Sequence, residues 1–234
     1  MKDAKRTLII TKGNRPVYDT MAKVFLPHED RLRLFVHGPS ESGKTAFARG
    51  FCEKRKPLSS RTALLIHPSL LTLMLTTLLE QSQGALGNMA ESDVLIIDSL
   101  DDAFLKENQG VGPEAVSRLV AARNRTKHDT VVFARKPIEC YGEVFGQAFK
   151  GFEQIEMKPL DYEGRIEFFR LIQEEESKNS ECARVFSEDA LAFFASSFAD
   201  DLSYGRRGAI ATLRSEAFPE QAVITEAMIR SANV

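Results

Sequence analysis

One loop carries the groups that bind a phosphate chain, and it comprises Gly38, Pro39, Ser40, Glu41, Ser42, Gly43, Lys44 and Thr45. The G-x-x-x-x-G-K-[ST] spacing suits this chemistry because its glycines let the backbone wrap a phosphate with N–H groups pointing inward. Lys44 is expected to reach the β- and γ-phosphates, and the Thr45 hydroxyl to coordinate Mg²⁺. The sequence therefore predicts a site for a nucleoside triphosphate or diphosphate with Mg²⁺.

A second metal-binding group is predicted where an apolar run ends. Residues 94–97 are all apolar, as expected for a strand covered on both faces, and Asp98 follows them. A carboxylate at this position is expected to hold Mg²⁺ through water, opposite Thr45.

The elements that position these groups follow from hydropathy. Short apolar runs alternate with helical patterns, which is typical of a parallel sheet with crossover helices. The expected strands cover 33–37, 62–67, 93–97, 130–134 and 152–157, and the expected helices cover 44–55, 68–81 and 113–123. Beyond residue 160 the pattern is helical only, with predicted helices at 161–175, from 187, at 203–216 and from 225. We predict an α/β core at 1–160 and a small helical domain at 161–234.

Composition favours a globular protein of ordinary type. The 234 residues are 43% hydrophobic and 27% charged, with a net charge of −2 and a pI near 6.1. This balance argues against a protein that coats nucleic acid through bulk charge. No apolar run reaches the roughly 20 residues that span a bilayer, so a cytoplasmic location without membrane contact is expected. The three cysteines are too far apart for a disulfide framework or a zinc site.

Further segments, in this order along the chain, resemble the DnaA/Hda family of AAA+ ATPases, which comprises the bacterial replication initiator and its regulatory inactivator. They are residues 7–15, 133–137, 159–165 and 203–207, and the similarity extends from about residue 7 to the C-terminus. The resemblance implies a P-loop core with an AAA+ lid that binds ATP or ADP. It further implies that Asn14 lies against the base and that Arg206 of the lid, or its neighbour Arg207, reaches the phosphates.

Three positions depart from the family pattern. The acidic residue that polarises water in the family is replaced by Ser99, whose hydroxyl cannot act as a general base near neutral pH. The small polar residue that ends the fourth strand falls on Ala134 or Arg135, and Ala148 occupies the place of the arginine finger. Asp101, Asp102 and Lys150 lie nearby in the sequence as imperfect substitutes. We expect slow or absent hydrolysis, and no catalytic residue is assigned.

Partners are expected to be proteins rather than duplex DNA. The chain ends after the lid and so lacks the family's duplex-reading domain, and no Lys or Arg occurs between residues 62 and 105, where the family contacts single strands. Basic clusters at 54–61 and at Arg118, Arg123, Arg125 and Lys127 are interpreted as solvated surface. Residues 1–6 show no hydrophobic motif for the sliding clamp. An AAA+ partner such as the initiator, or self-association, is expected.

Three alternatives remain to be weighed. A helicase loader or a transposition-helper ATPase belongs to the same superfamily and predicts binding to a helicase or to DNA. A small-molecule kinase would need an arginine-bearing lid inside the core, whereas the helical domain here follows it. A GTPase is disfavoured because the sequence has no Asn-Lys-x-Asp motif.

Overall fold

The computed structural model describes residues 10, 14–23, 31–40, 42–55, 63–67, 92–105, 111–179, 184–219 and 222–232. The helix predicted at 68–81 lies outside these residues, as do Lys56 and Arg61 of the basic cluster at 54–61. Contacts between Cα atoms divide the chain into two compact units, which we call the core unit (residues 12–159) and the C-terminal unit (residues 160–234).

The core unit is built on five parallel strands in the order β2-β3-β4-β1-β5. They comprise β1 (Arg33–His37), β2 (Ala63–Ile66), β3 (Val94–Ile97), β4 (Asp129–Ala134) and β5 (Glu153–Glu156). Every residue of β3 and β4 is buried, whereas the edge strand β5 is largely exposed. The central strands are apolar on both faces because helices cover both faces, as the sequence predicted.

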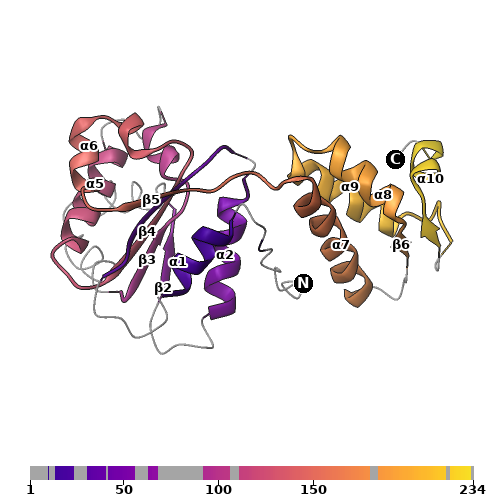
Figure 1. Cartoon of the computed structure of the whole chain (residues 1–234), viewed down its shortest axis with the longest axis horizontal. Coiled ribbons are helices and arrows are strands. Elements are labelled where there is room, and N and C mark those ends of the chain that lie inside the picture. Colours follow the sequence, from indigo (N-terminus) through magenta and orange to yellow (C-terminus); the bar gives the residue numbers. More distant parts are fainter. Residues whose placement is uncertain are drawn as a thin grey trace. The chain divides into compact units, whose positions relative to one another are not determined.

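Helices flank this sheet on both sides (Figure 1). They are α1 (Arg15–Ala22), α2 (Lys44–Arg55), α5 (Val111–Arg123) and α6 (Glu143–Ala148), with short 3₁₀ turns η3 (Leu100–Phe104) and η5 (Ile138–Tyr141). The α1 and α2 pair lies on the face opposite α5 and α6 (Figure 1), and the Tyr18 and Phe51 rings join α1 to α2 at 6.4 Å. Alternate residues of β4 serve the two faces: Val132 packs in the cluster that includes α5, and Phe133 lies 6.4 Å from Phe47 of α2.

The C-terminal unit is a helical bundle with a small addition. It contains α7 (Tyr162–Asn179), α8 (Glu188–Ser197), α9 (Leu202–Arg214) and α10 (Glu226–Ser231). Side-chain caps begin three of these helices where the sequence predicts helix starts: Asp161 accepts from the Gly164 N–H at 2.8 Å, and Ser187 and Thr225 accept from the backbone N–H groups three residues further on. The expectation of helices alone was incomplete, because β6 (Val185–Phe186) and β7 (Val223–Ile224) form a short parallel pair. No local sequence pattern predicts this pair, because its two strands lie far apart in the chain.

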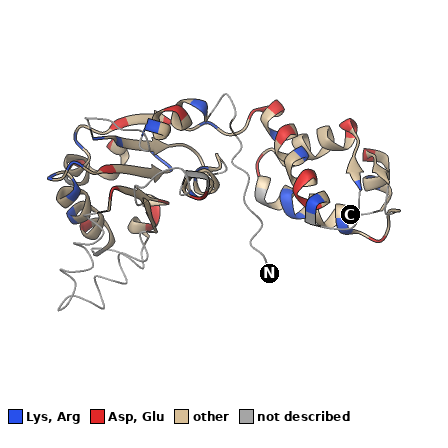
Figure 2. Ribbon diagram, turned by 90° about the horizontal axis from the view of Figure 1, so that it is seen from below, with Lys and Arg blue, Asp and Glu red and all other residues tan. Residues whose placement is uncertain are grey.

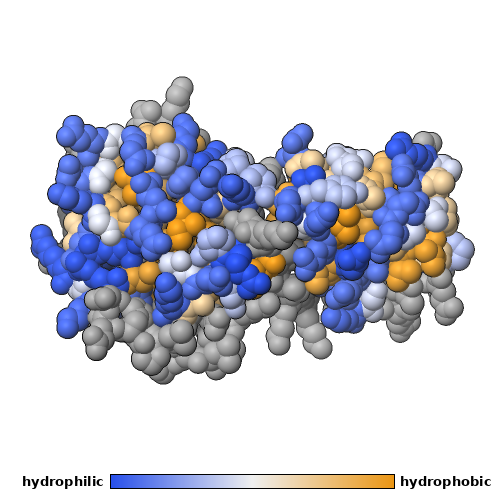
Figure 3. All heavy atoms as spheres, in the orientation of Figure 1, coloured by the Kyte–Doolittle hydropathy of each residue, from blue (hydrophilic) through white to orange (hydrophobic). Residues whose placement is uncertain are grey.

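In the part of the chain that the structure describes, no helix is long and apolar enough to cross a membrane. On the face drawn in Figure 3, apolar side chains form small islands among hydrophilic ones.

Two glycines of α9 differ in the space that is available for a side chain at their positions. A Cβ at Gly205 would lie 2.6 Å from Cβ and 2.8 Å from Cγ of Phe198, so α9 approaches its neighbour too closely for any side chain there. A Cβ at Gly208 would meet only Phe194 Cε1, at 3.8 Å, which is ordinary contact. The close approach therefore depends on Gly205 and not on glycine content in general.

We expect Gly205→Ala to lower the free energy of unfolding by about 1–3 kcal/mol, because overpacking forces Phe198 or the backbone to shift. Gly208→Ala is the matched control and is expected to raise it by about 0.5–1 kcal/mol, since alanine restricts the unfolded chain more than glycine does. Urea denaturation followed by circular dichroism measures both. Equal stabilities for Gly205→Ala and wild type would contradict the packing argument.

Candidate functional site

The phosphate-binding loop connects the end of β1 to the start of α2. Its first glycine is fixed by a close approach: the Gly38 N–H donates to the Ala134 carbonyl at 3.2 Å, and a Cβ at Gly38 would lie 2.2 Å from the Met157 carbonyl oxygen. Its second glycine, Gly43, has φ = +80°, which side-chain-bearing residues rarely adopt. Both glycines are thus required by geometry, and the Phe47 N–H to Gly43 carbonyl bond of 2.8 Å starts the helix.

Lys44 organises the loop from within. Its ammonium donates to the carbonyls of Gly38 and Pro39, both at 2.7 Å, and to the Ser42 hydroxyl at 3.0 Å. The side chain is 9% exposed, so a charge is held in a nearly dry position by oxygen acceptors. An ammonium inside a loop of this shape can exchange carbonyl oxygens for phosphate oxygens, and the residues present fit a phosphate group. Pro39 and Ser40 are exposed, while Glu41 lies outside the described residues.

The two predicted metal ligands meet in the structure. The Thr45 hydroxyl, on the first turn of α2, donates to Asp98 Oδ1 at 3.1 Å. Asp98 follows β3 directly, is 3% exposed, and its N–H donates to the Ile66 carbonyl at 2.9 Å. A hydroxyl and a carboxylate at this separation are the oxygen donors that Mg²⁺ prefers, and they lie beside the phosphate loop. These two residues are therefore the ones that would hold Mg²⁺, which would neutralise phosphate charge.

Asn14 precedes α1 and is 3% exposed. Its carbonyl accepts from the Tyr18 N–H at 3.0 Å and so begins the helix. Its predicted place against the nucleotide base stays a prediction. The sequence reading missed α1 itself, although Val17, Thr20 and Met21 are buried at the spacing of one helix face.

The residues after Asp98 are engaged in structure. Ser99 adopts the left-handed conformation, with φ = 58° and ψ = 51°, and its carbonyl accepts from the Asp102 N–H at the start of η3. Asp101 accepts from the Tyr141 hydroxyl at 2.6 Å and from the Arg135 N–H at 2.7 Å. The Asp102 carboxylate lies 2.9 Å from His67 Nε2. Both aspartates are thus engaged in contacts with other parts of the core unit.

Tyr141 is the residue near the site that sequence reasoning missed. Burial, and secondarily the hydrogen bond to Asp101, raises the pKa of its phenol above the ordinary range. The bond joins η3, which follows β3, to η5, which follows β4. We define this contact as the Asp101–Tyr141 latch. No spacing rule connects the two residues, because they lie 40 positions apart.

The other two altered positions serve the backbone. Ala134 ends β4 opposite His37 of β1, and its carbonyl receives the Gly38 N–H, so its contribution to the loop is a main-chain one. The Ala148 carbonyl accepts from Asn124 Nδ2 at 2.8 Å. Phe149, which follows it, is 1% exposed and packs in the core, while Lys150 is exposed.

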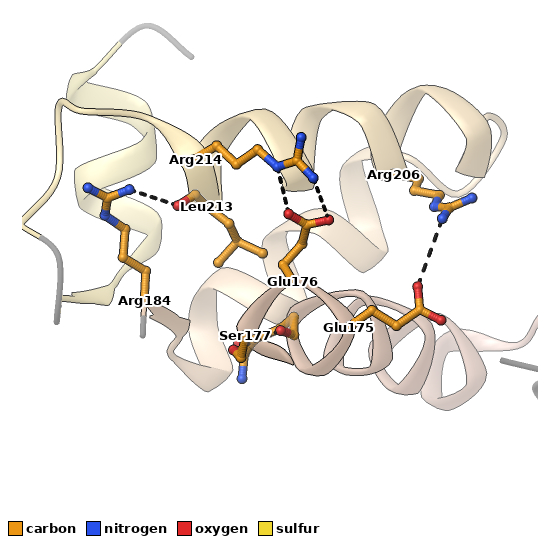
Figure 4. Close-up of polar contacts among 8 residues, drawn as sticks. Glu175, Glu176, Ser177, Arg184, Arg206, Leu213 and Arg214 are labelled. Carbon is orange, nitrogen blue, oxygen red and sulfur yellow. Dashed lines mark hydrogen bonds and ion pairs between the residues drawn. The ribbon is translucent and has the colours of Figure 1, made fainter. Parts of the chain in front are cut away.

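Arg206 lies in the C-terminal unit, on α9, where its guanidinium is 3.9 Å from Glu175 of α7 (Figure 4). This contact is loose compared with the pair that Arg214 and Glu176 form between the same helices, at 2.6 and 3.0 Å. Arg207 lies over the Tyr204 ring at 5.6 Å instead. The reach of Arg206 to the phosphates stays a prediction.

Comparison with known proteins identifies the fold. No protein-family model and no curated protein matches the sequence. Domain III of the replication initiation protein DnaA from Thermotoga maritima superposes with a TM-score of 0.75 over 98% of this chain and 95% of that one, at 17% identity. DnaA from Aquifex aeolicus bound to AMPPCP gives a TM-score of 0.72 over 99% and 69%, at 14% identity. DnaI gives 0.53 over 67% and 90%, at 12% identity.

The fold is a P-loop fold of the AAA+ type, with a parallel five-stranded sheet and flanking helices. Within that class it is similar to the AAA+ module of DnaA, over nearly the whole chain. The fold predicted from the sequence is confirmed.

The Thr45–Asp98 contact yields a test with a metal readout. Thr45→Val removes the hydroxyl at constant volume and is expected to weaken ATP binding about tenfold in Mg²⁺, because one charge-assisted ligand contact is lost. In EDTA the variant and the wild type are expected to bind alike. Isothermal titration calorimetry measures both conditions, with Thr45→Ser as the control that keeps the hydroxyl. An equal loss in EDTA would place the effect on the loop instead of the metal.

Proposed function

We propose that this chain binds ATP or ADP together with Mg²⁺ in the loop of residues 38–45 and works as a nucleotide-dependent switch. The observation that carries the proposal is the junction of the phosphate loop with the Thr45–Asp98 pair, because nucleotide binding needs both a phosphate cradle and a metal position. Asn14 is proposed to contact the base and Arg206 to reach the phosphates from the C-terminal unit.

Hydrolysis is proposed to be slow or absent. Ser99 offers no general base, and the nearby Asp101 carboxylate is occupied by Tyr141 and by the Arg135 N–H. Ala148 stands where the resemblance places the arginine finger, and loss of such a group costs several orders of magnitude in turnover. The residues proposed to bind the nucleotide are present, whereas the residues proposed to cleave it are replaced. The bound nucleotide is therefore proposed to remain unhydrolysed for a long time.

The biological role that fits best is regulation of DnaA-dependent replication initiation in the cytoplasm, in the manner of Hda-type proteins. The partner is proposed to be an AAA+ protein such as the initiator, or a second copy of this chain. Similarity to DnaA domain III over 98% of the chain supports this role above that of a helicase loader or transposition helper, since the DnaI structure matches over 67%. Recovery of the initiator in a nucleotide-dependent pull-down supports it, and recovery of a helicase favours the alternative.

Lys44→Ala tests nucleotide binding directly. Removal of the ammonium is expected to abolish the nucleotide that co-purifies with the chain and to weaken ATP binding at least a hundredfold, because a buried charge-assisted contact is lost. Chromatography of the released nucleotide and titration with a fluorescent ATP analogue measure the two effects. Normal binding by a folded Lys44→Ala protein would sink the proposed function.

Ser99→Glu tests the account of hydrolysis. A carboxylate at this position is expected to raise single-turnover ATP cleavage at least tenfold, since a placed general base contributes about 10²–10⁴ in rate. Ser99→Gln is the matched control, because it has the same shape and the same left-handed backbone without basicity. Wild-type turnover of order 1 s⁻¹ or faster, within the normal enzyme range, contradicts the proposal of a slow switch.

A further inference from the structure

The net charge of −2 is the sum of a slightly basic first part and an acidic second part of the chain. Residues 161–234 contain 14 acidic and 8 basic side chains, whereas residues 1–160 contain 23 basic and 19 acidic ones. The first part thus has a small positive excess, and the position of its cations in the fold decides whether they form a binding surface. In Figure 2, Lys and Arg positions gather at the left-hand end of the core unit.

The cations collect at the edge of the sheet where the parallel strands begin. Arg31 and Arg33 lie at the start of β1, Arg125 and Lys127 in the turn between α5 and β4, and Lys150 in the turn between α6 and β5. We call these five residues the basic edge. All except the half-buried Arg33 are exposed. Because parallel strands begin at a common edge, three turns that are distant in sequence are neighbours here.

The structure holds these turns together. Arg31 Nη1 and Arg33 Nη2 both donate to the Asn124 carbonyl, at 2.6 and 3.2 Å, so two guanidinium groups flank one oxygen. Asn124 in turn donates from Nδ2 to the Ala148 carbonyl at 2.8 Å, which joins the ends of α5 and α6. Burial and the positive charge of Arg31 lower the pKa of Arg33 from its ordinary value. The fold therefore keeps like charges close together at some electrostatic cost.

Asp129 and Glu153, which the structure describes, also begin strands at this edge, but neither forms an ion pair with the basic edge. Among the residues that the structure describes, Arg31, Arg33, Arg125, Lys127 and Lys150 form no ion pair. By contrast, Arg118 of α5, the helix that precedes Arg125 and Lys127, pairs with Glu114 at 2.5 Å. Arg123, which the sequence reading treated as solvated, is 1% exposed and donates to Ser92 and Asp129 carbonyls. Exposed lysines elsewhere, such as Lys136, Lys158 and Lys178, are also outside the ion pairs of the described residues. The basic edge is therefore distinguished by the grouping of its five cations and not by the lack of ion pairs alone.

We propose that the basic edge binds the phosphodiester backbone of a nucleic-acid strand. The five cations are spread over three turns and do not converge on one point, which suits a repeating charge better than a single phosphate. Stable protein interfaces and membrane-surface contacts usually include exposed apolar side chains, whereas Phe149 and Phe152, which flank Lys150 in the sequence, are 1% and 8% exposed. Without base-reading groups the contact is independent of sequence. This edge is opposite the one that carries Asp98 and the phosphate loop.

Fluorescence anisotropy with a labelled 30-nucleotide oligothymidylate tests the proposal on the full chain. Neutralisation of five phosphates predicts a slope of about −3.5 for log affinity against log salt. The triple variant Arg125→Gln, Lys127→Gln, Lys150→Gln is expected to flatten the slope to about −1.4 and to weaken binding at least tenfold at 50 mM salt. These side chains are exposed, so the thermal unfolding midpoint is expected to stay that of the wild type.

The matched control is Lys136→Gln, Lys158→Gln, Lys178→Gln, which removes three exposed lysines elsewhere and is expected to bind like wild type. No binding by wild type at 50 mM salt, or equal losses in the two triple variants, would overturn the proposal. So would binding of the chain to phosphatidylglycerol vesicles but not to the oligonucleotide. Loss of a dimer in the first variant alone, seen by sedimentation without oligonucleotide binding, would assign the edge to an acidic surface of a second copy.

Discussion

The backbone of Gly38 passes so close to the Met157 carbonyl that a hydrogen atom is the largest side chain the gap admits. This constraint sets the position of the phosphate loop, because the same residue is hydrogen-bonded to Ala134 on the other side. The loop is thus clamped between the ends of β4 and β5, with β1 between them. The two contacts of Gly38 therefore also fix the positions of Lys44, Thr45 and the first turn of α2. Asp98 completes the arrangement from β3, two strands away from β1 in the sheet.

The residues proposed to bind nucleotide and the residues that follow Asp98 belong to different parts of this framework, and only the first set depends on the contacts of Gly38. Ser99 and Asp101 belong to the segment after β3, where the chain turns through a left-handed residue into η3. The latch between Asp101 and Tyr141 occupies a carboxylate that lies two residues after Ser99 in the sequence. Substitutions in this segment can therefore change the groups after Asp98 without disturbing the glycine-dependent phosphate loop. This separation is why we favour a switch over an enzyme with fast turnover.

Local rules account for what the sequence predicted well. The glycine spacing, the apolar run that ends in Asp98, and the caps at Asp161, Ser187 and Thr225 all involve residues near one another in the chain. The failures are non-local. The β6–β7 pair joins segments far apart, and the place of Arg123 depends on carbonyls that only the folded sheet presents. Its charge alone suggested that Arg123 is solvated. In the structure the side chain is buried, and backbone carbonyls satisfy the hydrogen-bond donors of its guanidinium group.

The Asp101–Tyr141 latch also provides an intrinsic fluorescence signal. The sequence has no tryptophan and only four tyrosines, so its intrinsic emission comes from a small set of phenols. One of these, Tyr141, is hydrogen-bonded to a carboxylate whose chain neighbours lead directly to Asp98. Closure of that contact joins positions 40 residues apart, which carries a loop-closure entropy and requires β4 to lie beside β3. Tyrosine emission of the unlabelled protein should therefore follow the assembly of the sheet edge beside the phosphate loop.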